Sequence, residues 1–199
     1  MQKHLILASA SEIRREMLEN AGVEFTTSVA RIDEESIKSS LLAENASPQD
    51  IADTLAEMKA LRVSAKNPEA LVIGSDQVLE FQGQLINKPT SLKDARDQLI
   101  LLRGKPHKLL SAAVIARNGQ PLWRHVGAVR LWMRDFSDGY LDAYLSRLGD
   151  EALTTVGGYK LEAEGVRLFT RIEGDFFTVL GMPLLEVLNY LTETGVLEK

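Results

Sequence analysis

The sequence predicts an α/β fold in which helices flank a mixed, twisted sheet, and two patterns lead to this prediction. In the first half of the chain, short apolar runs alternate with amphipathic helical segments, as in α/β proteins. The middle of the chain contains strand pairs joined by tight turns, which add antiparallel strands to the sheet. The 199 residues contain no repeat, linker or low-complexity stretch, so we expect one domain over residues 1–199.

Local signals along the chain predict the individual elements. A strand at residues 5–8 precedes a helix at 12–21, and Ser47-Pro48 opens a helix that ends near residue 65, with serine as N-cap and proline at the first helical position. Further strands are expected at 23–29, 71–77, 109–116, 122–133 and 166–172, and a glycine-containing loop at 155–162 is expected to run into a strand. Further helices are expected at 91–102, 137–148 and 182–194, and tight turns at 82–83, 117–120 and 173–176.

Composition excludes several classes of protein. The net charge of −5 argues against non-specific nucleic-acid binding, since there is no general basic excess to displace counterions. The chain has no cysteine, which excludes disulfides, thiolate zinc sites and a cysteine nucleophile. The apolar run at the N-terminus is too short for a signal peptide or a membrane span. We therefore expect a cytoplasmic protein with no nucleic-acid or membrane partner.

The run Leu71-Val72-Ile73-Gly74-Ser75-Asp76-Gln77 places polar groups directly after a buried apolar strand. Polar groups at the carboxyl end of such a strand face the crevice where α/β sheets bind ligands. Asp76 is therefore the first candidate for chemistry, and the turn at 82–83 would bring Lys88 back towards it. Taken alone, this stretch fits equally well with an Asp76 that caps a turn and a solvated Lys88.

Arg14 and Arg15 lie in the first turn of a predicted helix, directly after Ser9-Ala10-Ser11. Cations at the N-terminal end of a helix are unfavourable because they oppose the helix dipole, so a pair of them indicates a role other than helix stability. Backbone N–H groups, serine hydroxyls and two guanidiniums together make a site for a polyanion such as phosphate. The alternative is a solvated pair of arginines with ion pairs to Glu12 or Glu19. After a strand and a serine turn, we favour phosphate binding.

A series of segments resembles the Maf family of nucleotide pyrophosphatases. Each segment is weak evidence alone, but their order and spacing cover almost the whole chain. The segments are Leu5-Ile6-Leu7-Ala8-Ser9-Ala10-Ser11 with Arg14-Arg15, Ile32-Asp33-Glu34, Glu57-Met58-Lys59-Ala60, Ile73-Gly74-Ser75-Asp76-Gln77, Asn87-Lys88-Pro89, Leu102-Arg103-Gly104-Lys105-Pro106-His107, Gly157-Gly158-Tyr159, Ile172-Glu173-Gly174-Asp175 and Val179-Leu180-Gly181-Met182-Pro183-Leu184.

The resemblance implies a single two-lobed α/β domain of the Maf and ITPase-like type, with a cleft between the lobes. It also implies hydrolysis of a nucleoside triphosphate to the monophosphate and diphosphate, with Mg²⁺ or Mn²⁺ as cofactor. The resemblance is also the sole basis for expecting a homodimer. A nucleotide-binding cell-division regulator with little turnover is the alternative, since its binding site would look the same.

The matched positions fit this chemistry. The catalytic set of the family matches Glu34, Lys59, Asp76 and Lys88. Asp76 is the implied proton acceptor, and Glu34 and Asp76 carry oxygens that suit Mg²⁺ or Mn²⁺. Lys59 and Lys88 supply positive charge for the phosphate oxygens. The triphosphate would be held by Ser9, Arg14 and Arg15. His107 and His125 are interpreted as structural residues.

Three departures from the family pattern concern arginine alignment, the Lys59 segment and substrate choice. The step from Ser11 to Arg15 is one residue longer than usual and lacks proline, so either Arg14 or Arg15 can match a given family arginine. Met58 separates the acidic residue from Lys59, where the usual pattern has glutamate next to lysine. Ser75-Asp76-Gln77 replaces the usual alanine-aspartate-threonine step.

The sequence gives conflicting signals about which nucleotide base the protein prefers. The Ser-Asp-Gln step with Gln77 resembles the subgroup that acts on 7-methyl-GTP, whereas Gly157-Gly158-Tyr159 is nearer to the dTTP/UTP subgroup. Glu162 would accept hydrogen bonds from a cationic or donor-bearing base edge, which suits 7-methylguanine without excluding uracil or thymine. Gln77 and Glu162 are therefore candidate substrate-binding residues, and we favour slightly a modified purine or a broad specificity.

Overall fold

The computed structural model describes residues 4–199 and contains one mixed sheet of seven strands flanked by helices, which confirms the predicted α/β class. The strand order is β2-β1-β3-β5-β6-β7, with β4 beside β3. The strands are β1 (Leu5–Leu7), β2 (Thr26–Thr27), β3 (Leu71–Phe81), β4 (Gln84–Ile86), β5 (Pro106–Arg117), β6 (Gln120–Met133) and β7 (Phe169–Glu173). The α-helices are α1 (Glu12–Asn20), α2 (Glu34–Ala43), α3 (Pro48–Ser64), α4 (Leu92–Leu102), α5 (Asp138–Leu148), α6 (Phe176–Leu180) and α7 (Leu184–Glu193).

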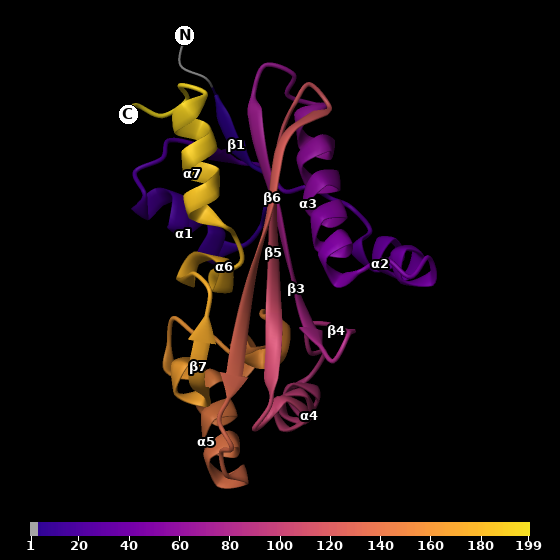
Figure 1. Ribbon diagram of the computed structural model, residues 1–199, viewed down its shortest axis with the longest axis vertical. Helices are drawn as coiled ribbons and strands as arrows, with labels where there is room; N and C mark the ends of the chain where they lie inside the picture. The colour runs from indigo at the N-terminus through magenta and orange to yellow at the C-terminus, as the bar shows by residue number, and fades with distance from the viewer. Residues whose placement is uncertain (1–3) are drawn as a thin grey trace.

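Three long strands, β3, β5 and β6, run through the length of the molecule and connect two lobes (Figure 1). In the upper lobe, α3 covers one face of the sheet, while α1, α6 and α7 cover the other. In the lower lobe, α4, α5 and β7 surround the opposite ends of the same strands. Each lobe has its own apolar core, with Leu7 and Val187 in the upper lobe and Leu99 and Tyr144 in the lower.

The edge of β3 is unpaired where the two lobes meet. Strand β1 pairs in parallel with residues 71–73, and β4 pairs antiparallel with residues 79–81. Residues 74–78 therefore have no strand on that side, although β5 pairs with them on the other. Asp76 lies in the middle of this stretch rather than at the end of a strand, because the antiparallel partner β5 carries β3 on to Phe81. The strand that ends beside this stretch is β1, because Leu7 pairs with Ile73.

Serine caps set the start of three helices as predicted. The hydroxyls of Ser47, Ser91 and Ser137 each accept a hydrogen bond from the backbone N–H three residues later. Ser47 also forms a capping box with Asp50 at the start of α3. The tight turns predicted at 82–83 and 117–120 are confirmed too, since Gln82 and Gly83 have positive φ between β3 and β4, as do Asn118 and Gly119 between β5 and β6.

Two segments in the first quarter of the chain differ from the prediction. The strand expected at 23–29 shrinks to the two residues of β2, which lie exposed at the edge of the sheet. No helix was predicted at 34–43, yet Asp33 accepts a hydrogen bond from Ser36 N and caps α2, and the acidic residues Glu34 and Glu35 lie in its first turn. Helix α2 has no fully buried side chain; its half-buried Ile37 and Leu41 pack against the apolar core around α3 and form only a narrow apolar stripe, which is a weak signal for a helix.

The region after α5 was predicted least well. The loop at 155–162 does not run into a strand: Gly157 and Gly158 have positive φ, and successive turns follow them. The strand expected at 166–172 begins with a 3₁₀ segment, Glu164–Leu168, and only then becomes β7. Asp175, expected in a turn, caps the single-turn helix α6.

Among residues 4–199, none of the helices combines the length and apolar composition that a bilayer crossing requires.

Candidate active site

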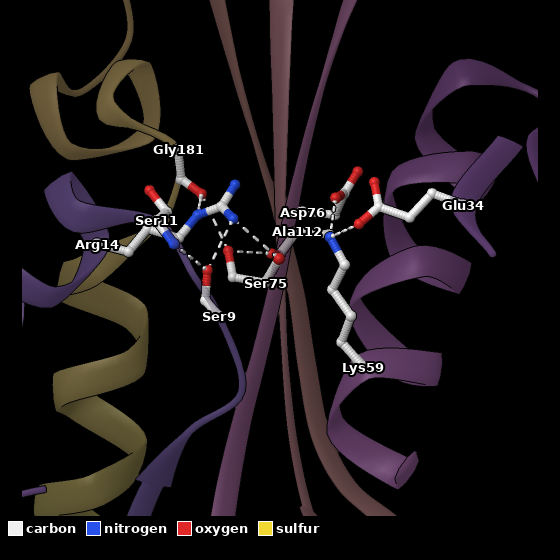
Figure 2. A network of polar contacts seen from close by, with 9 residues as sticks. All are labelled: Ser9, Ser11, Arg14, Glu34, Lys59, Ser75, Asp76, Ala112 and Gly181. Atoms are coloured by element: carbon white, nitrogen blue, oxygen red, sulfur yellow. Dashed lines mark hydrogen bonds and ion pairs between the residues drawn. The ribbon is translucent and has the colours of Figure 1, made fainter. Parts of the chain in front are cut away.

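The centre of the candidate site is a lysine held between two carboxylates (Figure 2). Lys59 Nζ lies 2.6 Å from Asp76 Oδ1 and 2.8 Å from Glu34 Oε1. The side chains of Lys59 and Asp76 are only 10% and 8% exposed, whereas that of Glu34 is 41% exposed. Because an unpaired charge is costly at such depth, the ammonium compensates the two carboxylates and fixes them side by side.

Close packing of α3 on β3 brings Lys59 to Asp76. Gly74 lies two residues before Asp76 on the same face of β3. A Cβ at Gly74 would lie 2.2 Å from Ala56 O and 2.6 Å from Ala60 N, so only glycine lets the helix backbone approach this closely. Glu34 reaches the pair from the first turn of α2.

The charges around Glu34 favour its ionised form. Partial burial, the largest single contribution, raises the pKa of Glu34. The hydrogen bond from Lys59 and the charges of Lys59, Lys38 and Lys88 together outweigh burial, so the pKa of Glu34 is lowered.

Arg14 is bound to the peptide unit that carries Asp76. Its Nη1 donates to the carbonyl of Ser75 at 3.1 Å and approaches Ser9 Oγ at 3.4 Å, while its Nε donates to Gly181 O at 2.8 Å. Burial lowers the pKa of Arg14, and the charges of Asp76 and Glu34 act against this. No hydrogen bond from Nη2 to any residue in 4–199 is found, so this nitrogen remains for a ligand.

The serine turn before α1 adds donors beside Arg14. Ser9 Oγ accepts a hydrogen bond from Ser11 N at 3.1 Å. Ser11 is the N-cap of α1, but its side chain makes no capping bond, so amides of the first turn remain available to an anion. Ser9, Ser11 and Arg14 therefore lie together as expected, and phosphate binding by them stays a prediction.

Lys88 joins the site from the segment that follows β4. Its side chain is exposed to water, while the charges of Arg14, Glu34 and Asp76 act on its ammonium. Burial lowers the pKa of Lys88, and Arg14 lowers it further, while Glu34 and Asp76 act in the opposite direction. Within residues 4–199, no carboxylate forms an ion pair with Lys88, so its charge is free for a ligand.

Arg15 lies outside the site. Its side chain is 44% exposed and makes ion pairs with Glu12 at 3.0 Å and Glu19 at 3.6 Å. It also lines a surface cavity of about 600 Å³ with Glu19 and Phe25. The two arginines therefore differ: Arg14 contacts the backbone next to Asp76, and Arg15 adopts the solvated alternative.

No hydrogen bond or ion pair joins Gln77 or Glu162 to the charged side chains of the site. Gln77 lies on the face of β3 opposite to Asp76 and donates to backbone carbonyls of α6. Glu162 is exposed in a turn of the lower lobe, and no hydrogen bond or ion pair joins it to the rest of residues 4–199. Its charge raises the pKa of neighbouring Lys160, although the Glu151 contact contributes most.

Sequence reasoning missed Ser75 and Gly181 as parts of the site. Ser75 is fully buried; its carbonyl accepts from Arg14, and its hydroxyl lies 2.9 Å from Gly181 O. The available signals were a small residue directly before Asp76 and a glycine that ends a short apolar segment before Met182-Pro183. Neither signal reveals that residues more than 100 positions apart meet.

The carboxylates suit a metal ion only in part. Within the described residues, no three His, Cys, Asp or Glu side chains come together as a ready-made metal site. Lys59 occupies one oxygen of Asp76 and one of Glu34 and leaves Oδ2 and Oε2 without a hydrogen bond from residues 4–199. Two carboxylate oxygens fit Mg²⁺ or Mn²⁺, which usually complete their coordination with water and substrate phosphates.

Comparison with known proteins identifies the family. The family model described as Maf-like protein matches residues 4–194. The chain is 61% identical to the nucleoside triphosphate pyrophosphatase of Roseobacter denitrificans over 199 residues, which is all of both chains. It is 52% identical to that of Caulobacter vibrioides and 47% identical to the 7-methyl-GTP pyrophosphatase of Brucella abortus, each over 191 residues and 96% of both chains. The chain therefore belongs to the Maf family.

Proposed function

We propose that the protein hydrolyses a nucleoside triphosphate between its α- and β-phosphates, releasing the nucleoside monophosphate and inorganic diphosphate (pyrophosphate). The observation that carries this proposal is the buried Lys59 between Glu34 and Asp76, with Arg14 bound to the same peptide unit as Asp76. A site that only binds anions has no need for two carboxylates beside its cations. The names of the relatives, nucleoside triphosphate pyrophosphatase and 7-methyl-GTP pyrophosphatase, support the same activity.

The residues divide the chemistry between them. Arg14, Lys88 and the first amides of α1 bind the phosphate chain and compensate its negative charge. A water molecule attacks the α-phosphorus, and its proton passes to Asp76 as the P–O bond forms. The bond from the α-phosphorus to the bridging oxygen then breaks, and the diphosphate leaves with that oxygen. Lys59 holds Asp76 and Glu34 in place throughout.

A divalent metal is the proposed cofactor. Glu34 Oε2 and Asp76 Oδ2 would hold Mg²⁺ or Mn²⁺ together with water and phosphate oxygens. The bound ion would supply positive charge to the phosphate oxygens. Turnover is therefore expected to stop when a chelator removes the metal and to return when Mg²⁺ or Mn²⁺ is added.

The base is proposed to be a modified purine such as 7-methylguanine, or one of several bases. Relatives with 46–47% identity are named 7-methyl-GTP pyrophosphatase, and the exposed carboxylate of Glu162 suits a cationic or donor-bearing base edge. Preference for dTTP or UTP is the alternative. We also infer that the protein works in the cytoplasm on free nucleotides, and a homodimer remains a prediction from the resemblance.

Pyrophosphate release across a nucleotide panel tests the activity. The panel contains the standard ribo- and deoxynucleoside triphosphates and 7-methyl-GTP, each with Mg²⁺ or Mn²⁺. In the Asp76→Asn variant, kcat should fall about 100-fold or more, while nucleotide affinity measured without added metal changes little, because the proton acceptor is lost but Arg14 and Lys88 remain. Asp97→Asn, at an exposed position on α4, is the matched control. Tight nucleotide binding without release of pyrophosphate by the unmodified protein would favour the regulator instead.

A further inference from the structure

Glu34 reaches the charged site from the first position of helix α2 (Figure 2). Its Oε1 lies 2.8 Å from Lys59 Nζ, so the carboxylate is held only while the backbone of this position is in place. Helix ends fray, and the N–H groups of a first turn have no partners within the helix. The position of Glu34 therefore depends on what orders the first turn of α2.

Packing alone gives helix α2 limited support. The helix has ten residues, and isolated helices of this length are marginal in water. None of its side chains is fully buried, and the half-buried Ile37 and Leu41 make its apolar contacts with the core around α3. Both of these residues lie beyond the first turn. The start of α2 therefore depends strongly on its cap.

Asp33 is this cap. Its Oδ1 accepts a hydrogen bond from Ser36 N at 3.1 Å, and its Oδ2 accepts one from Ser36 Oγ at 2.8 Å. Its carbonyl also accepts the first hydrogen bond of the helix, from Ile37 N at 3.2 Å. Both carboxylate oxygens are thus engaged by Ser36, and Asp33 orders the backbone on either side of Glu34.

We infer that Asp33 is a positioning residue for Glu34, which acts as a helix cap through Ser36 and not through its charge. With the cap in place, Glu34 is held beside Lys59 and Asp76. Without the cap, the first turn of α2 opens and Glu34 loses its fixed position. This inference rests on the proposed function. It predicts that a side chain able to cap the helix can replace Asp33 even when it carries no charge.

The first test separates the cap from the charge. Asp33→Ala removes the acceptor for Ser36 N, so we expect kcat for pyrophosphate release to fall about tenfold. Nucleotide affinity measured without added metal should change little, because Arg14 and Lys88 remain. Asparagine caps helices as well as aspartate does, since its Oδ1 can accept from Ser36 N and its NH₂ can donate to Ser36 Oγ. Asp33→Asn should therefore retain most of the kcat. If the asparagine variant is as slow as the alanine variant, the charge itself is needed and the inference is overturned.

Ser137→Ala is the matched control for the loss of a cap. Ser137 Oγ accepts a hydrogen bond from Tyr140 N at 3.2 Å and caps α5 in the lower lobe, away from the charged site. The stability of this variant should fall about as much as that of Asp33→Ala, but its kcat should be unchanged. An equal fall in kcat for both variants would mean that turnover follows general stability, and the inference would fail.

The second test asks whether the effect passes through Glu34. In a Glu34→Ala background, Asp33→Ala should add little to the loss of kcat, because the group that Asp33 positions is gone. A full additional loss would show that Asp33 acts elsewhere and would overturn the inference.

Hydrogen exchange of the α2 amides gives a readout that does not depend on turnover. Exchange at residues 36–40 should be about tenfold faster in Asp33→Ala than in the unmodified protein and nearly unchanged in Asp33→Asn. Unchanged exchange in Asp33→Ala would overturn the inference, because the first turn would then be ordered without the cap. If the unmodified protein releases no pyrophosphate, the proposed function fails, whereas hydrogen exchange still judges whether Asp33 orders the turn that carries Glu34.

Discussion

Lys88 is the residue whose charge sets how the site responds to alkaline pH. Burial and Arg14 lower the pKa of Lys88, so its ammonium loses the proton at a lower pH than an exposed lysine would. Since binding of a polyanion needs that charge, kcat/KM should decline on the alkaline side as pH rises through the lowered value. Arginine keeps its charge there, so Lys88→Arg should move the decline to higher pH.

A pH profile of kcat/KM between about pH 7 and 11 checks this expectation. Lys93→Arg is the matched control, because the Lys93 side chain is 85% exposed and pairs with Asp97. The control should decline together with the unmodified protein. An alkaline decline that is identical for Lys88→Arg would show that another group limits the reaction.

The difference between Arg14 and Arg15 shows what the sequence can and cannot predict for single residues. Two cations after a strand and a serine turn were enough to predict a phosphate site. Successive residues of a helix point about 100° apart, so only one of the two arginines can face the site. The partner that holds Arg14 is Gly181, 167 residues away, and no local pattern reveals such a contact.

Packing of α3 against β3 is the contact between elements on which the site depends most. Because the backbone of α3 lies where a Cβ of residue 74 would be, Gly74→Ala should push the helix away from the sheet. We expect the free energy of unfolding to fall by about 3 kcal/mol. Lys59 would move with α3, so kcat/KM should also fall, by about tenfold or more.

Urea unfolding and pyrophosphate release measure the two effects. Gly139→Ala in α5 is the control, since a Cβ there meets nothing within 4 Å. Its stability should be unchanged or slightly raised, because alanine is the better helix former. If Gly74→Ala unfolds at the same urea concentration as the unmodified protein, the close approach of α3 is not what positions Lys59.

Elements were predicted where local chemistry decides them and missed where tertiary contacts do. Helices α3, α4 and α5 carry a serine cap and an apolar face, and their starts were predicted correctly. Helix α2 has no fully buried side chain, and its apolar stripe of Ile37 and Leu41 is too narrow to be a strong signal. Helix α6 is one turn that depends on Gln77 and Ser111, which come from other parts of the chain.

At the scale of the whole molecule, one sheet serves both lobes. Strands β3, β5 and β6 contribute to the apolar cores of the upper and the lower lobe (Figure 1). A perturbation deep in one lobe should therefore be felt by the entire chain, which is expected to unfold in a single transition. His107 on β5 offers such a perturbation, because it is 2% exposed in the lower lobe and far from the charged site.

Acidification should destabilise the protein through His107. Burial lowers the pKa of His107 to about 4, and its Nε2 lies 2.7 Å from the hydroxyl of buried Tyr159. The unfolded chain takes up the proton near pH 6.5, so stability is lost as pH falls from about 6.5 to 4 and this contribution is constant below that range. The free energy of unfolding should fall by about 3 kcal/mol over this range. His107→Gln cannot take up the proton and should not show this loss.

Urea unfolding at several pH values between 7 and 4 measures this difference. Trp123 stacks on Tyr190 of α7 in the upper lobe, and Trp132 contacts Arg171 of β7 in the lower lobe, so Trp123→Phe and Trp132→Phe backgrounds report on each lobe separately. Because the sheet is shared, both tryptophans should report the same midpoint at each pH. The stability gap between the unmodified protein and His107→Gln should shrink towards pH 4 in both backgrounds. A gap that stays constant would contradict the role of His107, and a midpoint that moves for Trp132 alone would show that the lobes unfold independently.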